Sequence, residues 1–288
     1  MKSIINYILS IILALAIIVF YLINLASSTV LSEQYILSKL DEHDYYNKIH
    51  EQIKLNFENY IHQSGLEEDV LDNIITKEKV KKDTHIILGS IYDGLNQEVD
   101  TNEIRENLNK NIEKYIKSTS LTKEQKSSID TFVNHICNEY KTTISHFTFE
   151  NQINQYYSKI IKYINMSKKV LLITIGIDFL LLIVLNLKKI YKCFTSVGVS
   201  FVIIGLIVLV SNIFINIKIK VQAILILNDA ISEVIRNILS EILNSSLIIA
   251  LFTLIFGIAM IIIPNLIHNI KKYGKLKSKD EETYEKNN

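Results

Sequence analysis

Long uncharged apolar runs are the feature that most restricts the fold of this 288-residue chain. The run Ile4 to Ala26 contains no Asp, Glu, Lys or Arg over 23 consecutive positions. As a helix rising about 1.5 Å per residue, it reaches roughly 35 Å, enough to cross the hydrocarbon core of a bilayer. The runs 193–217 and 245–267 are also uncharged, and the run 170–187 carries a single charge, Asp178. This pattern predicts four transmembrane helices and excludes a single soluble domain.

Helix-breaking residues are scarce along the whole chain. One proline, eight glycines and no tryptophan leave little material for a turn-rich β fold. Apolar residues recur at helical spacing throughout the segment between the first two apolar runs. We therefore expect an all-α integral membrane protein with four transmembrane helices and, between spans one and two, a helical extracytoplasmic domain of about six helices.

The ends of the apolar runs set the expected domain boundaries. The first run is longer than the roughly 7 to 15 apolar residues of a cleaved signal peptide, so we interpret it as an uncleaved signal anchor. In chain order, we expect the cytoplasmic N-terminus with transmembrane helix 1 at 1–27, the extracytoplasmic helical domain at 28–167, transmembrane helix 2 at 168–189, transmembrane helix 3 at 193–217, an extracytoplasmic amphipathic helix at 218–244, transmembrane helix 4 at 245–268 and a basic cytoplasmic tail at 269–288.

Lysines beside the apolar runs predict how the chain crosses the membrane. They are dense in the short turn between spans two and three and again after span four. These membrane-surface basic residues are Lys188, Lys189, Lys192, Lys271, Lys272 and Lys275. Lysines at 168–169 and 218–220 flank the opposite ends of the spans but are more widely spread. The difference in density predicts a multi-pass protein of the bacterial cytoplasmic membrane with both termini cytoplasmic, and a tail that either binds anionic lipid or serves only as a topology signal.

The large segment between spans one and two is acidic. From Ser27 to Ser167 it has 22 Asp and Glu against 16 Lys and Arg, a net charge of −6. The remaining residues carry +7, and together the two parts make the net charge of +1 of the whole chain. Nucleic acids bind proteins mainly through cationic contacts to phosphate. We therefore expect no nucleic acid partner, and expect the lipid bilayer together with a protein partner or a second copy of the chain.

Apolar spacing and capping residues predict the first helices of the acidic segment. Thr29 is a candidate N-cap for a helix over 31–40. Apolar residues at 45, 49, 53 and 57 repeat every four positions toward Gly65, a candidate C-cap. A short helix over 67–75 follows, so that three helices are expected before Thr76.

The later helices of this segment carry clearer start signals. Thr76 can cap a helix that runs to Leu95. Asp100 with Glu103 resembles a capping box for a helix over 104–116, and Thr122 with Gln125 repeats that pattern. From Glu150 the helical spacing continues without Gly or Pro into the second apolar run, which predicts one helix of roughly 38 residues ending at Leu187.

The loop between spans three and four contains an amphipathic helix. Apolar residues share one face and polar residues the other over 231–242. The apolar face must be covered, either by the acidic segment, by the lipid interface or by a second copy of the chain. The polar face is not basic, which disfavours the lipid interface.

Asp178 is the main candidate for chemistry because it lies nine positions inside the second span. An ionised carboxylate near the bilayer midplane costs at least about 2.5 kcal/mol, so this side chain should face protein or water. Thr174 lies one turn earlier on the same face, and other small or hydroxyl neighbours are offered by Ser10, Ala14, Ser200, Gly205, Thr253 and Gly257. Asp178 is then either a proton- or cation-responsive site of a pore or transporter, or a protonated donor in an interhelical hydrogen bond.

Three further sets of residues have side chains that bind metals or form interhelical bonds in other proteins. Asn212 and Asn216 form an i, i+4 pair near the outer end of span three and could contact Asn24, more as interhelical glue than as a site. His43 and His50 share a helical face near acidic residues, but their spacing does not match a metal motif, so we expect a solvated polar face and no metal. The two cysteines, Cys137 and Cys193, lie on opposite sides of the membrane in this topology and cannot pair. Cys137 then is a buried thiol or an intermolecular link.

Motifs of known catalytic and nucleotide-binding sites are absent from the sequence. It has no Gly-x-x-x-x-Gly-Lys loop, no Gly-x-Gly-x-x-Gly, no Gly-x-Ser-x-Gly and no kinase motif set. We therefore expect no cofactor and no enzyme. The layout resembles multi-pass proteins of the bacterial cytoplasmic membrane, and the richness in Lys, Ile and Asn is similar to that of chains from AT-rich Gram-positive genomes.

Three functions are consistent with this sequence. The first is a membrane-anchored module whose extracytoplasmic helical domain binds an envelope partner or self-associates. The second is a small transporter or channel subunit that uses Asp178. The third is an accessory sensor, in which the long helix from Glu150 to Leu187 conveys binding to a separate cytoplasmic protein.

Overall fold

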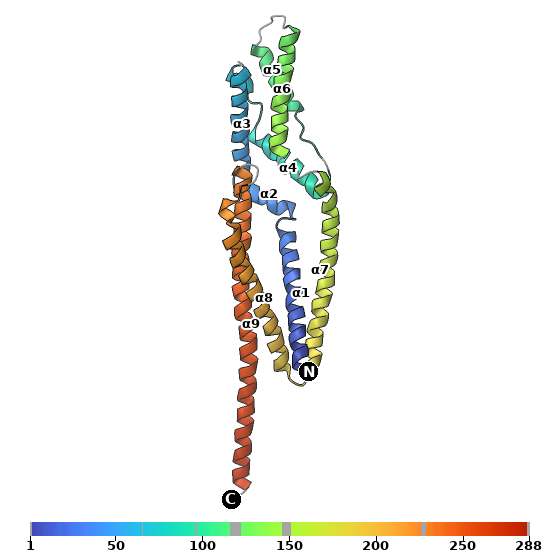
Figure 1. The fold of residues 1–288 in the computed structure, drawn as a ribbon, viewed down its shortest axis with the longest axis vertical. Helices are drawn as coiled ribbons and strands as arrows, with labels where there is room; N and C mark the ends of the chain where they lie inside the picture. Colours follow the sequence, from blue (N-terminus) through green and yellow to red (C-terminus); the bar gives the residue numbers. More distant parts are fainter. Residues whose placement is uncertain are drawn as a thin grey trace. The chain divides into compact units, whose positions relative to one another are not determined.

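The computed structural model of the chain is built from helices (Figure 1). It describes residues 2–64, 66–95, 97–115, 122–145, 151–225 and 229–286, and none of these forms a β-strand. The elements are α1 (Lys2–Ser28), α2 (Glu33–Glu42), α3 (Tyr45–Ser64), η1 (Glu68–Leu71), α4 (Lys77–Asp93), α5 (Asn102–Tyr115), α6 (Lys123–Ile144), α7 (Asn151–Leu185), α8 (Ile190–Ile219), η3 (Val221–Ala223) and α9 (Asp229–Lys286). The expected all-α class is confirmed.

The chain divides into two compact units. The apolar unit contains Met1–Ala26, Ile164–Ile224 and Arg236–Asn288, and the polar unit contains Ser27–Tyr163 and Leu225–Ile235. The division falls close to the predicted boundary between the acidic segment and the apolar runs.

Among the described residues, three helices are long and apolar enough to cross a membrane. They are Lys2–Ser28, the stretch Ile190–Ala223 and the stretch Asp229–Tyr273. The apolar part of α7 is shorter, because Lys168 and Lys169 precede it and Asp178 interrupts it. A membrane protein is thus supported by three helices, and the fourth span stays a prediction.

The core of the polar unit lies along one face of α3. Ile49, Ile53 and Phe57 are buried at the predicted spacing of four residues, with Tyr45 and Ile61 completing the row. This face packs against α4 and α6, and α5 packs against α6 and η1. Large side chains from those helices fill the same core: Ile87, Ile104, Leu108, Ile136, Tyr140 and Ile144.

Two of the predicted helix starts are confirmed. The Thr76 side chain accepts a hydrogen bond from the Lys79 backbone nitrogen at the start of α4. Thr122 and Gln125 form the reciprocal capping box at the start of α6. Such side chains satisfy N–H groups that have no partner within the first helical turn.

Two other predicted starts are wrong. Thr29 caps no helix, because α1 runs to Ser28 and Ser32 accepts the N-terminal hydrogen bond of α2 from Tyr35. Asp100 accepts a bond from the Asn102 nitrogen, so α5 begins earlier than predicted. Glu103 consequently does not complete a capping box and pairs instead with a lysine of α4.

The short helix predicted over 67–75 is also corrected. Only Glu68–Leu71 forms a helical turn, of the 3-10 type, and the chain then extends through Asp72. Asn73 has φ 56°, a left-handed conformation that ends helical geometry and that asparagine tolerates better than most residues. Two predicted boundary residues, Gly65 and Glu150, lie outside the described residues.

The helices α7 and α9 both extend well beyond their apolar runs. α7 covers 35 residues, close to the predicted 38. α9 covers 58 residues and continues through Pro264. Proline has no backbone N–H to donate to the preceding turn. In the same turn, the side-chain amide of Asn265 donates to the Ile261 carbonyl oxygen (2.6 Å).

The apolar face of the predicted amphipathic helix is covered by protein. Ala230, Ile231 and Val234 are buried, and residues 225–235 belong to the polar unit. The Lys48 ammonium of α3 lies 2.6 Å from the Glu233 carboxylate of α9. Packing against the acidic segment is therefore the alternative that this face adopts.

Small residues bring the helices of the apolar unit close together. Ser10 donates to the carbonyl oxygen of Ser196, and Ser200 donates to the carbonyl oxygen of Ser10, both at 2.8 Å, which ties α1 to α8. At Gly198 and Gly257, α8 and α9 approach so closely that neither residue has room for a Cβ atom. Close approach of this kind is typical of helices that associate within membranes, where small residues let backbones meet.

Candidate functional site

Asp178 is buried in the apolar unit. Its side chain is 4% exposed, and its Oδ2 atom has no hydrogen-bond partner among the described residues. One turn later on the same face of α7, Leu182 belongs to an apolar cluster with Leu13, Cys193 and Val197. This carboxyl group therefore lies beside a closely packed apolar core.

The expected hydroxyl neighbour of Asp178 bonds elsewhere. The half-buried Thr174 donates its hydroxyl to the Val170 carbonyl oxygen in the same helix (2.9 Å). Ser10 and Ser200 are likewise engaged with backbone carbonyl oxygens at the α1–α8 contact. None of these three hydroxyl groups forms a hydrogen bond with the Asp178 carboxyl group.

Asn212 and Asn216 form an interhelical connection. Asn216 donates to the side-chain oxygen of Asn212 (2.8 Å), and buried Asn212 donates to the Leu243 carbonyl oxygen of α9. Asn24 donates to Phe20 in its own helix (2.8 Å) rather than to this pair. The two asparagines thus join α8 to α9, as expected of interhelical glue.

The membrane-surface lysines lie where α7 ends and α8 begins, and farther along α9. Lys188 and Lys189 occupy the turn, and Lys192 lies in the first turn of α8. Lys271 and Lys272 are exposed on α9, and the side chain of Lys275 lies outside the described part of the structure. Near these residues Tyr191 and His268 stack with ring centroids 4.0 Å apart.

The histidines and cysteines of the sequence analysis form no common centre. His43 caps the end of α2, whereas the Nε2 atom of His50 lies 3.3 Å from the Ile75 carbonyl oxygen. Over the described residues, no cluster of three His, Cys, Asp or Glu is placed to hold a metal ion. Cys137 and Cys193 are both free and buried, which favours the interpretation of Cys137 as a buried thiol.

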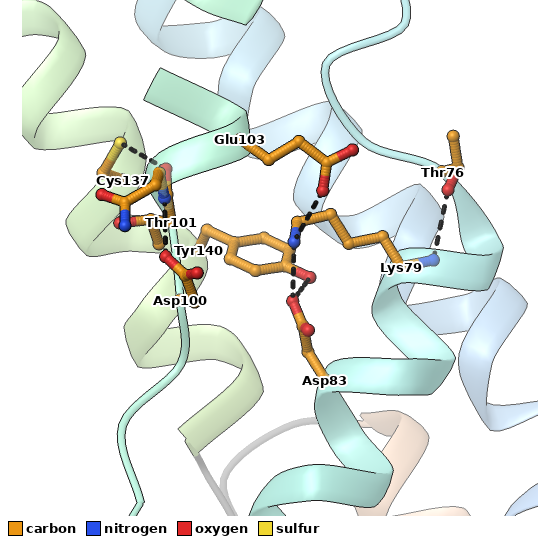
Figure 2. Close-up of polar contacts among 9 residues, drawn as sticks. Thr76, Lys79, Asp83, Asp100, Thr101, Glu103, Cys137 and Tyr140 are labelled. Carbon is orange, nitrogen blue, oxygen red and sulfur yellow. Dashed lines mark hydrogen bonds and ion pairs between the residues drawn. The ribbon is translucent and has the colours of Figure 1, made fainter. Parts of the chain in front are cut away.

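A buried polar cluster in the polar unit was not predicted. Figure 2 shows the Tyr140 hydroxyl donating to Asp83 (2.7 Å) while the Lys79 ammonium lies 3.3 Å from both Asp83 and Glu103. The Lys79 and Asp83 side chains are 14% and 7% exposed. Burial, with the hydrogen bond to Asp83, raises the pKa of Tyr140, so the phenol stays protonated and keeps donating. This cluster joins α4, α5 and α6.

The i, i+4 spacing of Lys79 and Asp83 was the only sequence signal for that cluster. Such pairs are common on exposed helix faces, and only the packing of α5 and α6 over this face buries them. A ligand would have to displace core side chains to reach the carboxylate. The cluster therefore stabilises the packing of α4, α5 and α6 and is not a binding site.

A hollow lies beside η1 in the polar unit. We call it the η1 hollow; it has a volume of about 380 Å³. Its lining residues come from α3 and from the chain around η1: His50, Lys54, Phe57, Glu58, Glu68, Asp69, Leu71, Asp72, Asn73, Ile74 and Ile75. Phe57 and Ile74 are buried and form an apolar floor, whereas most of the rim is charged.

The wall of the η1 hollow is held by side-chain hydrogen bonds to the backbone. The Asn111 amide of α5 donates to the carbonyl oxygens of Val70 (3.2 Å) and Asp72 (3.0 Å). A second hollow of about 470 Å³ continues from Asp69, Asp72 and Asn73 to the lysines of α5. The chain around η1 therefore forms a fixed ridge between two hollows.

The comparisons with known proteins add no functional information. Neither the family models, nor the curated proteins, nor the solved structures include a match to this chain. The geometry of the described residues is thus the basis for a functional proposal.

Proposed function

We propose that this chain is a non-enzymatic, membrane-anchored module whose polar unit faces the outside of the bacterial cytoplasmic membrane and binds an envelope protein at the η1 hollow. The observation that carries the proposal is the hollow itself, with its buried apolar floor and acidic rim. The occupant that fits is an extended protein segment that presents an apolar side chain next to a basic residue.

The charge of the η1 hollow favours such a segment. Four carboxylates line it, Glu58, Glu68, Asp69 and Asp72, against the single ammonium of Lys54. Lys54 lies 4.0 Å from Glu58, which leaves an excess of negative charge on the η1 side of the rim. Complementary charge speeds association and discriminates against wrong partners more than it adds affinity.

The apolar part of α7 is assigned as the fourth span in this proposal. Together with the three longer helices it gives an even number of crossings, so that both termini lie in the cytoplasm. The dense lysines at 188–192 and 271–272 then lie inside, in agreement with the positive-inside rule. The first helix is a signal anchor, and the helices between α1 and α7 form the extracytoplasmic domain.

Sidedness is tested by labelling of intact cells. Single cysteines are placed at Gln97 and at Ser278 in a chain from which Cys137 and Cys193 are removed. A membrane-impermeant maleimide should label position 97 and not position 278. Labelling of position 278 alone would place the acidic segment in the cytoplasm and refute an envelope partner.

Partner binding is tested by photo-crosslinking of the full chain in its native membrane. A photoreactive amino acid replaces Asp72 on the rim of the η1 hollow, and Asp130, exposed on α6, is the matched control position. We expect one envelope protein to be crosslinked from position 72 and not from position 130. The adduct should fall about tenfold with Asp69→Lys and stay within about twofold with Asp130→Lys, because only the former reverses charge in the hollow.

Three results would contradict the proposal. Equal crosslinking from both positions would show that contact is not specific to the η1 hollow. An adduct of two copies of this chain would replace the envelope partner by self-association. An adduct yield that Asp69→Lys leaves unchanged would show that binding does not depend on the acidic rim.

A further inference from the structure

A further hollow lies within the apolar unit. It has a volume of about 200 Å³ and opens between the start of α1, the start of α8 and the later part of α9. Polar side chains line it from all three helices: Ser3, Asn6, Tyr7, Lys192, Thr195 and Asn265. We call it the α1/α8/α9 hollow. Hydroxyl, amide and ammonium groups together can donate to a single anion.

The walls of this hollow are fixed before any ligand binds. Asn6 and Asn186 exchange two amide hydrogen bonds, at 3.0 and 3.1 Å, which join the start of α1 to the end of α7 (Figure 1). On the opposite wall, Asn265 donates to the Thr195 hydroxyl oxygen (3.0 Å). A site whose side chains are already held in place loses less entropy on binding.

The surroundings of the α1/α8/α9 hollow carry only positive charge. Segments 2–26, 186–200 and 261–273 contain no Asp or Glu. The same segments contain six lysines: Lys2, Lys188, Lys189, Lys192, Lys271 and Lys272. The start of α8 at Ile190 adds the partial positive charge of a helix N-terminus. The ligand class that matches is therefore an anion with several acceptor oxygens, such as a phosphate group.

Apolar side chains beside the hollow indicate where that phosphate comes from. Ile4 and Ile8 of α1, and Ile190 and Phe194 of α8, are large and exposed on the helices that form its walls. An inorganic phosphate ion has no apolar part that could contact these side chains, whereas a phospholipid carries acyl chains next to its phosphate. Basic pockets between helices on the cytoplasmic side are known to suit anionic headgroups.

We infer that the α1/α8/α9 hollow binds the phosphate group of an anionic phospholipid, with Lys192 as the counter-charge and Tyr7 as a hydroxyl partner. The lipid then bridges the start of α1, the start of α8 and the later part of α9. The inference concerns the apolar unit alone and does not depend on what the η1 hollow binds.

The test measures lipid retention by the purified full chain in native mass spectrometry. The chain is exposed to equal amounts of phosphatidylglycerol and phosphatidylcholine in detergent micelles. We expect phosphatidylglycerol to be retained at least about tenfold more, and Lys192→Gln to reduce this retention about tenfold, as for a charge-assisted hydrogen bond. Lys188→Gln, which removes the same charge from a residue outside the lining, should stay within about twofold.

A second variant and a second anion complete the test. Tyr7→Phe removes one hydroxyl from an exposed position and should weaken phosphatidylglycerol retention several-fold even if Lys192→Gln proves unstable. Millimolar inorganic phosphate should not displace the lipid. The inference is overturned by equal retention of both lipids, by equal loss in Lys188→Gln and Lys192→Gln, or by phosphate that binds where phosphatidylglycerol does not.

Discussion

Gly198 of α8 and Gly257 of α9 meet backbone to backbone. A Cβ atom added to either glycine would lie 2.8 Å from the carbonyl oxygen of the other. Seven residues along α8, a Cβ on Gly205 would lie 2.9 Å from the carbonyl oxygen of Ala250. The same spacing of seven separates Ala250 from Gly257 on α9. The two helices therefore run against each other along a seam that only the smallest residues permit.

The seam predicts a strong effect of substitution at Gly198. Gly198→Leu should destabilise the full chain in detergent by more than about 2 kcal/mol, because the helices must separate to admit the side chain. Gly176 has no atom within 4 Å of its added Cβ, so Gly176→Ala should be neutral or stabilising by up to about 1 kcal/mol. Thermal unfolding followed by circular dichroism measures both. Equal effects would mean that α8 and α9 do not pack through this seam.

The buried cluster around Asp83 predicts a second difference. Asp83→Ala should cost about 2–4 kcal/mol of unfolding free energy, because it leaves the Lys79 ammonium and the Tyr140 hydroxyl without their buried acceptor. Glu98, 89% exposed, forms a surface ion pair with Lys141, and Glu98→Ala should cost less than about 1 kcal/mol. Chemical unfolding of the full chain compares the two. A cost for Asp83→Ala as small as that for Glu98→Ala would show that the cluster is solvated.

His85 predicts a pH dependence of stability. Burial, followed by the nearby Lys81 ammonium, lowers the pKa of His85 from 6.5, and its Nε2 atom lies 3.0 Å from the Tyr46 hydroxyl. Since the folded-state pKa is below the unfolded value, the neutral ring stabilises the fold. This contribution is complete above about pH 6.5 and is lost as the pH falls through the folded-state pKa.

Thermal unfolding between about pH 7.5 and pH 5 measures that dependence. The parent chain should lose stability on acidification, and His85→Gln should lose less. His62→Gln, at an exposed histidine, should retain the contribution from His85. A variant at His85 with the same pH profile as the parent would assign the acid sensitivity to other groups.

The unpartnered carboxyl group of Asp178 predicts that its removal does not destabilise the fold. An unsatisfied buried polar atom costs about 1–3 kcal/mol, so Asp178→Leu should leave the chain as stable as the parent or more stable. Asn186→Leu is the matched substitution, and it should destabilise by about 2 kcal/mol because it strands the amide of Asn6. Thermal unfolding in detergent ranks the three chains. Destabilisation by Asp178→Leu equal to that of Asn186→Leu would indicate that the carboxyl group is a structural donor.

Substitution of Asp178 also distinguishes the proposed binding module from a transporter or channel. In reconstituted vesicles, the parent chain and Asp178→Asn should show the same ion and proton permeability if the chain is a binding module. Loss of flux in Asp178→Asn at equal protein abundance would instead support the transporter or channel alternative.

Local signals in the sequence determined the helices and several of their ends. The uncharged runs predict α1, most of α8 and the central part of α9, because length and polarity alone decide whether a helix can cross a bilayer. Thr76 and the Thr122–Gln125 box predict two helix starts because capping needs only residues within one turn. The spacing of Ile49, Ile53 and Phe57 predicts which face of α3 is buried.

Tertiary contacts decided the features that no local pattern contains. Glu103 pairs with Lys79 instead of capping its own helix, because the tertiary structure brings the start of α5 within ion-pair distance of α4. The η1 hollow combines α3 with the segment after η1, which the sequence predicted to be helical. The left-handed conformation of Asn73 and the hydrogen bonds from Asn111 keep that segment out of a helix. The α1/α8/α9 hollow joins Tyr7, Lys192 and Asn265, which are far apart in sequence. The spacing of apolar residues predicts which face of a helix is buried. Only the tertiary structure determines which other helix packs against that face.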